Sequence, residues 1–150
     1  MKRSEASIQT FLLDTNVFIS AIKEPKRKTD TLELIIKIIG DSNIRLVGNY
    51  LLAYEMVRYA EVLRSETATF LLASLLSKME IVEVPKKYRK ICRMYIKTPD
   101  SADILHAATC LQSGAVLVTN DKHFHKIRDE GIIEVGTYPR QSNNLSSYLM

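Results

Sequence analysis

Short apolar runs alternate with helix-like segments along the chain, and this alternation limits the fold more than any other feature. The runs are aliphatic and β-branched on both faces, and they cover residues 11–13, 43–48, 80–84, 115–119 and 132–136. Strands that are buried on both faces are typical of a parallel sheet covered by helices. The sequence therefore predicts a three-layer α/β/α sandwich with a central, mostly parallel sheet of about five strands.

The segments between these runs carry helix signals. Asp30 with Glu33 resembles a capping box, Gly40 marks the end of the same helix, and Asn49 is a suitable cap for the next one. Residues 85–97 form a basic amphipathic pattern, with Tyr88, Ile91, Cys92 and Tyr95 on one face. Helices are predicted over 17–23, 30–40, 49–64, 66–78, 85–97, 100–114 and 122–131.

Length and composition agree with one globular domain over residues 1–150, with a polar tail from about 137. The chain has 150 residues, of which 46% are hydrophobic and 25% charged. No apolar run is long enough for a bilayer, and the N-terminal stretch has no signal-peptide pattern, so we expect a cytoplasmic protein. Cys92 and Cys110 form no C-x-x-C motif and are expected to be reduced packing residues. The net charge of +4 favours an anionic partner.

Two of the predicted strands are followed closely by an acid. Asp14 ends the run at 11–13, and Asp121 comes two residues after the run at 115–119. Ligands bind at the carboxyl ends of parallel strands, so these acids converge if the two strands are neighbours. Carboxylates held close together repel each other, and a bound cation relieves that repulsion. Alternatively, each acid caps the helix that follows it.

Two further acids are candidates for the same cluster. Asp103 lies in the first turn of its helix, where it could instead interact favourably with the helix dipole. Glu55 lies among apolar neighbours in its helix, where it could instead be solvated or pair with Arg58. Residue chemistry alone does not select Glu55.

The ligand types indicate a hard cation, Mg²⁺ or Mn²⁺, because the candidate ligands are all oxygens. No Cys/His cluster with zinc spacing exists, and His123 and His125 do not share a helix face. The nucleotide-binding glycine motifs and the G-x-S-x-G motif are also missing. Metal ions held by carboxylates can activate water for phosphodiester hydrolysis, which suits a basic protein. Candidate RNA-contacting residues are Lys26, Arg27, Lys28, Lys86, Lys87 and Arg89, although such basic stretches are also common on solvated surfaces.

Four segments, taken in order, resemble the PIN-domain nucleases, a group that includes the VapC-type toxins. They are "FLLDTNVFI", "NYLLAYEMVR", "DSADILHAATC" and "GAVLVTNDKHF", and together they span residues 11–124. They match the family's four acids at Asp14, Glu55, Asp103 and Asp121. Asp100 competes with Asp103, which is preferred because His106 and Ala108 follow it at the expected spacing.

The resemblance implies an α/β/α sandwich and an endoribonuclease that depends on Mg²⁺ or Mn²⁺. It implies that the four acids form one catalytic, metal-binding pocket. Toxin members pair with a small antitoxin protein, and a homodimer is common. Residues expected to orient the ligands or water, or to lie beside them, are Thr15, Asn16, Thr119, Asn120 and His106.

Two other functions remain open. The domain could be a catalytically weak module that binds RNA or protein. It could also be a metal-dependent phosphatase with an aspartyl nucleophile, but such enzymes carry a second aspartate at the position where this chain has Asn16.

Overall fold

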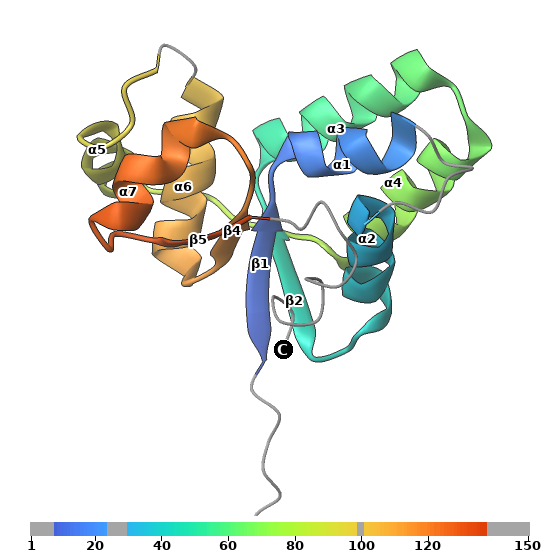
Figure 1. Cartoon of the computed structure of the whole chain (residues 1–150), viewed down its shortest axis with the longest axis horizontal. Helices are drawn as coiled ribbons and strands as arrows, with labels where there is room; N and C mark the ends of the chain where they lie inside the picture. The colour runs from blue at the N-terminus through green and yellow to red at the C-terminus, as the bar shows by residue number, and fades with distance from the viewer. Residues whose placement is uncertain (1–7, 24–29, 99–100, 138–150) are drawn as a thin grey trace, which may run out of the picture.

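The strands form one parallel sheet in the computed structural model, which describes residues 8–23, 30–98 and 101–137 (Figure 1). Within these ranges the strands are β1 (Gln9–Leu13), β2 (Ile44–Gly48), β3 (Glu80–Ile81), β4 (Val116–Val118) and β5 (Glu134–Gly136). Their order is β3-β2-β1-β4-β5. The central strands are buried on both faces, as Leu12, Leu13 and Leu117 are all 0% exposed. The predicted parallel sheet is confirmed.

The strand order reverses beside β1. The chain runs outward from β1 to β2 and β3, and then returns to the other side of β1 for β4 and β5. In register, Phe11 lies opposite Leu46 of β2, and Leu13 lies opposite Val118 of β4. The carboxyl ends of β1 and β4 therefore meet at the switch point of the sheet, where ligands bind in open α/β folds.

Helices flank the sheet on both sides, as predicted. In Figure 1, α1 to α4 lie to one side of β1 and β2, and α5 to α7 lie to the other. Crossovers between parallel strands are right-handed, so two halves that travel in opposite directions place their helices on opposite faces. The helices are α1 (Thr15–Lys23), α2 (Asp30–Gly40), α3 (Tyr50–Leu63), α4 (Glu66–Lys78), α5 (Lys86–Arg93), α6 (Ser101–Ser113), the 3₁₀ turn η1 (Lys122–Phe124) and α7 (His125–Asp129).

Several boundaries differ from the prediction. The third strand covers only two residues of the predicted 80–84, because it is an exposed edge strand whose pairing with β2 ends there. Helix α5 ends at Arg93, and in the turn that follows the N–H groups of Tyr95 and Ile96 both donate to Cys92 O. The predicted apolar face of this helix is only partly correct, because Ile91 is 39% exposed while Cys92 is buried.

Other features lie in the core or outside the described residues. Cys92 and Cys110 are free and buried, as expected. Among the described residues, no helix has the length and apolar character needed to cross a membrane. The basic stretch Lys26–Lys28, the alternative acid Asp100 and the tail beyond residue 137 lie outside the described residues.

Candidate functional site

Asp14 joins the ends of the two central strands. Its N–H donates to Val118 O at 3.1 Å, and its Oδ2 accepts a 2.8 Å hydrogen bond from Thr119 Oγ1. Asp14 is 6% exposed. Burial raises the pKa of Asp14 above its ordinary value, against the opposing effect of the Thr119 hydrogen bond. Because burial disfavours the charged form of Asp14, a cation bound nearby would stabilise its carboxylate.

Asp121 lies three residues after β4, because that strand ends at Val118 and not at Thr119 as predicted. Its N–H donates to Thr119 Oγ1 at 3.0 Å, so one threonine hydroxyl contacts both acids of the switch point. Its Oδ1 accepts the N–H of His123 at 2.9 Å and caps η1. Asp121 therefore does cap the helical turn that follows it, and it also lies beside the other candidate acids.

Asp103 and His123 bring a nitrogen into the cluster. Asp103 is 7% exposed in the first turn of α6. Nδ1 of His123 lies 3.0 Å from Asp103 Oδ2 and 3.2 Å from Asp121 Oδ1. One potential ligand atom from each of these three residues lies within 4.8 Å of the other two. They are suitably placed to share a cation.

His123 was missed as a site residue by the sequence interpretation, which compared it only with His125. Its actual neighbours are two acids, one of them 20 residues away along the chain. A local signal existed, because an aspartate side chain often accepts the N–H two residues later. That turn places His123 beside Asp121, and only the packing of α6 brings Asp103 there.

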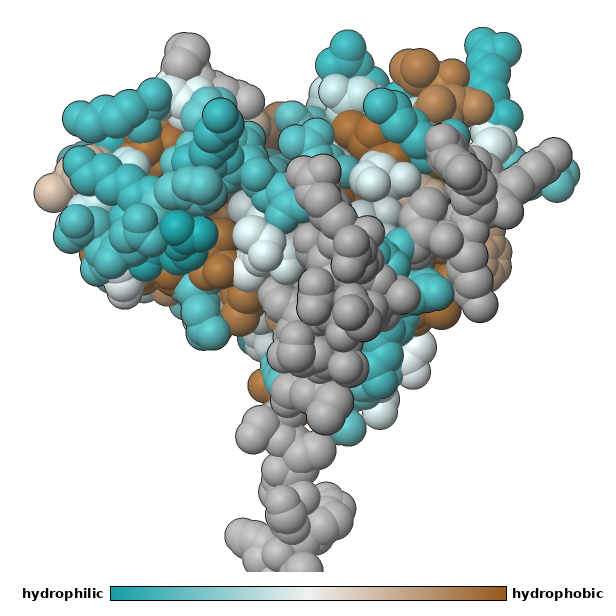
Figure 2. All heavy atoms as spheres, viewed as in Figure 1, coloured by the Kyte–Doolittle hydropathy of each residue, from teal (hydrophilic) through white to brown (hydrophobic). Residues whose placement is uncertain are grey.

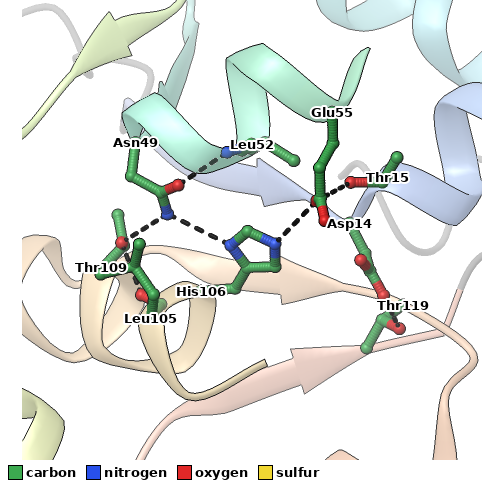
Figure 3. A network of polar contacts seen from close by, with 9 residues as sticks. All are labelled: Asp14, Thr15, Asn49, Leu52, Glu55, Leu105, His106, Thr109 and Thr119. Atoms are coloured by element: carbon green, nitrogen blue, oxygen red, sulfur yellow. Dashed lines mark hydrogen bonds and ion pairs between the residues drawn. The ribbon is translucent and has the colours of Figure 1, made fainter. Parts of the chain in front are cut away.

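Glu55 reaches the site from the middle of α3. Its Oε1 accepts a 2.8 Å hydrogen bond from Thr15 Oγ1 and lies 3.6 Å from His106 Nε2 (Figure 3). The contact with His106 lowers the pKa of Glu55, and the Thr15 hydrogen bond acts in the same direction. The charge of Arg58 contributes least to this lowering, so the alternative in which Glu55 pairs with Arg58 describes a minor part of its environment.

A small cavity of about 150 Å³ brings the four acids together. Its lining residues are Asp14, Thr15, Asn16, Ile19, Glu55, Tyr59, Ala102, Asp103, His106 and Asp121. Thr119 acts on Asp14 from beside the cavity, and Asn120 is half-buried and not in the lining. Carboxylates concentrated in so small a space repel unless a cation or protons offset their charge. The oxygen-rich donor set, with His123 nearby, fits a divalent metal ion.

The comparisons with known proteins identify a family. The family model described as PIN domain matches residues 11–130, a range that contains all four acids. The chain belongs to the PIN domain family.

Three solved structures of similar fold are named VapBC2, VapBC-1 and FitAB. VapBC2 from Rickettsia felis, bound to a DNA fragment from its promoter, is 18% identical with a TM-score of 0.62, over 87% of this chain and 100% of that chain. VapBC-1 from nontypeable Haemophilus influenzae is 19% identical with a TM-score of 0.59, over 87% and 98%. FitAB bound to the IR36 DNA fragment is 21% identical with a TM-score of 0.52, over 85% and 94%. At these identities the likeness shows the PIN fold. No curated protein matches the chain.

Proposed function

We propose that this PIN domain is a metal-dependent endoribonuclease that hydrolyses phosphodiester bonds in RNA. One observation carries the proposal. Asp14, Glu55, Asp103 and Asp121 come from separate segments of the chain and line one small cavity at the switch point of the sheet. In this proposal they hold Mg²⁺ or Mn²⁺ and are the catalytic residues. His123 offers a softer nitrogen ligand beside Asp103 and Asp121, which favours a transition-metal ion over Mg²⁺.

The protein's own groups prepare the site. A bound divalent cation would stabilise the negative charge on the phosphoryl oxygens and would make the attacking water easier to deprotonate. Thr119 holds the Asp14 carboxylate, and Thr15 holds that of Glu55, so neither acid must reorganise when the cation binds. Asn16 also lines the cavity, where its amide can orient water or a phosphate oxygen.

The test of this activity compares cleavage of structured and single-stranded RNAs in Mn²⁺, in Mg²⁺ and in EDTA. The wild type and Asp14→Asn are assayed side by side. Cleavage is expected only from the wild type with metal. Cleavage that persists in EDTA, or in the variant, would overturn the assignment of the site. If the wild type binds RNA but never cleaves it, the chain is a binding module and the enzymatic proposal fails.

Basic side chains of α5 are proposed to hold the RNA backbone. Lys86, Lys87 and Arg89 lie on this helix, which packs against the helix that carries Asp103. Arg89 also lines a cavity of about 440 Å³. Asn49 lines the same cavity and is hydrogen-bonded to His106. The surface over α5 and α7 is largely hydrophilic (Figure 2). The proposed contacts at Lys26, Arg27 and Lys28 lie outside the described residues.

RNA binding is therefore expected to weaken steeply with salt. Each phosphate contact to a single strand contributes about −0.7 to the slope of log K against log salt concentration. Replacing Lys86, Lys87 and Arg89 with alanine should make the slope shallower by about 2. Fluorescence anisotropy with labelled RNA measures it, on an Asp14→Asn background that prevents cleavage. Lys37→Ala on α2 is the control and should leave the slope unchanged. A flat dependence in the parent protein would contradict a surface that follows the RNA backbone.

A small antitoxin protein as partner, and a homodimer as assembly, belong to the same proposal. The VapBC names of the structural neighbours support the antitoxin. Exposed apolar side chains on α3 and α4 offer a surface for a protein, with Tyr54, Val62 and Phe70 at 62%, 73% and 68% exposure. Figure 2 shows hydrophobic residues at the end of the molecule where Figure 1 draws these helices.

A further inference from the structure

A chain of buried polar contacts runs from the start of α3 to Glu55 (Figure 3). Its central members are Asn49, His106 and Thr109, which are 2%, 1% and 0% exposed. Buried polar groups must be paired with correct donor and acceptor roles, because an unmatched pair costs the full desolvation of both groups. The roles along this chain of contacts can therefore be worked out one contact at a time.

The orientation of the Asn49 amide follows from the helix that it caps. Its Oδ1 lies 2.8 Å from the N–H of Leu52, the third residue of α3. A backbone N–H can only donate, so the oxygen of the amide must face it. The nitrogen Nδ2 consequently points to Thr109 and His106.

The two hydrogens of Nδ2 have one acceptor each. Thr109 Oγ1 donates its own hydrogen to Leu105 O at 2.7 Å, so it accepts from Asn49 Nδ2 at 3.0 Å. The second hydrogen points to His106 Nδ1 at 3.1 Å. A proton on Nδ1 would face this donor, so Nδ1 is the unprotonated nitrogen. The imidazole proton then lies on Nε2, which faces Glu55 Oε1 at 3.6 Å.

This proton position has a consequence for Glu55. Its Oε1 accepts the hydrogen bond from the Thr15 hydroxyl, and the Nε2–H group of His106 points toward the same oxygen at 3.6 Å. Within the described residues no hydrogen bond reaches Oε2. Thr15 thus anchors one oxygen of the carboxylate, with His106 Nε2 beside the same oxygen, while the other oxygen accepts no hydrogen bond from the described residues and Glu55 lines the cavity.

We propose that Asn49 is a positioning residue for Glu55: it sets the Nε2–H tautomer of His106, which then holds the carboxylate for the cation. Glu55's role as a ligand rests on the proposed function, whereas the tautomer does not. The residue type supports the inference. Serine, threonine and aspartate cap helices about as well as asparagine, but only asparagine combines an acceptor for Leu52 with donors for both Thr109 and His106.

Three variants separate this role from helix capping. Asn49→Asp keeps a good cap but replaces the donor that faces His106 with an acceptor, so it draws the imidazole proton to Nδ1. Ser65→Ala removes the cap of α4, where Ser65 Oγ accepts from Ala68 N at 2.9 Å, and does not touch His106. Asn49→Ser, which caps without reaching His106, is the third variant and covers the case in which the aspartate variant does not fold.

Nitrogen-15 NMR of His106 in the metal-free protein reads the tautomer, and a Mn²⁺ titration reads the cation affinity. We expect Nε2–H in the wild type and in Ser65→Ala. In Asn49→Asp we expect the proton on Nδ1, with Mn²⁺ affinity weaker by about tenfold or more. Asn49→Ser should show the same loss of affinity. In cleavage, kcat should fall in both Asn49 variants while KM for RNA stays unchanged.

The opposite results are equally clear. An Nδ1–H tautomer in the wild type would overturn the hydrogen-bond assignment. Unchanged Mn²⁺ affinity in both Asn49 variants would reduce Asn49 to a helix cap. A wild type with the Nε2–H tautomer that binds no Mn²⁺ would overturn the cation role of Glu55, and with it the purpose assigned to Asn49, while the hydrogen-bond chain itself would stand.

Discussion

Replacing Asp14 with asparagine is expected to abolish RNA cleavage and to make the metal-free protein more stable at neutral pH. The loss of activity should be about a thousandfold or more, because the cation's charge stabilisation is worth several kcal/mol. The gain in stability comes from burial. Asp14 is 6% exposed, and burial raises its pKa, so its charged form is disfavoured in the fold. An asparagine carbonyl can still accept the hydrogen bond from Thr119.

The pH dependence of this effect has a definite sign. The pKa of Asp14 is higher in the folded state than in the unfolded state. Its contribution to stability is therefore fully present below the unfolded pKa and is lost as pH rises through the folded pKa. The stabilising effect of Asp14→Asn should thus be largest near neutral pH and fade on acidification. Thermal denaturation in EDTA over a pH series measures it, and a gain of about 1 kcal/mol corresponds to roughly 2–4 °C.

Asp41→Asn is the matched control with the opposite sign. The N–H of Asn43 and the ammonium of Lys37 lower the pKa of Asp41, so its contribution is present at neutral pH and is lost on acidification. That variant should be less stable at neutral pH, without loss of cleavage. Adding Mn²⁺ should stabilise the wild type by about 2.7 kcal/mol at a hundred times its dissociation constant, and Asp14→Asn far less. An Asp14→Asn protein that is destabilised at neutral pH would contradict the burial argument.

Phe124→Ala is expected to cost about 3–5 kcal/mol of the free energy of unfolding. The ring is 0% exposed and belongs to η1, the turn that also presents Asp121 and His123. Truncation leaves a cavity beneath this turn and frees both ligand-bearing residues to move. A loss of this size is a large share of a typical domain's 5–15 kcal/mol. Urea denaturation in EDTA measures the stability, and a Mn²⁺ titration at low temperature measures the effect on the site.

A second phenylalanine provides the control. Phe70 on α4 is 68% exposed, so Phe70→Ala should change stability by no more than about 0.5 kcal/mol and leave Mn²⁺ affinity unchanged. Phe124→Leu retains most of the apolar volume and should fall between the two alanine variants. A loss below about 1 kcal/mol for Phe124→Ala would show that η1 does not depend on this anchor.

Local patterns predicted much of the fold. Apolar runs located β1 and β2 closely, and Asn49 was recognised as the cap of α3 from its residue type and place. The shorter β3 could not be foreseen, because the length of its pairing depends on the neighbouring strand. The earlier end of α5 comes from a turn around Cys92 that its apolar pattern does not indicate.

The candidate site divides in the same way. Asp14 and Asp121 were selected by their places after strands, and their proximity required β1 and β4 to be neighbours, as they are. Glu55 was selected only by the family resemblance, since its contacts with Thr15 and His106 join residues distant in sequence. His123 was set aside because it shares no helix face with His125, whereas its actual partner Asp103 lies on another helix.

By itself, the sequence determined the order of strands and helices, the helix caps and the acids that follow the two central strands. Each of these depends on apolar periodicity or on hydrogen bonds within a few residues of one another. Only the tertiary structure decided that β4 lies beside β1, that His123 contacts Asp103, and that the Asn49 amide directs the His106 proton toward Glu55. Those relations arise where strands pair and where helices and turns far apart in the sequence pack together, so they depend on contacts that no local pattern contains.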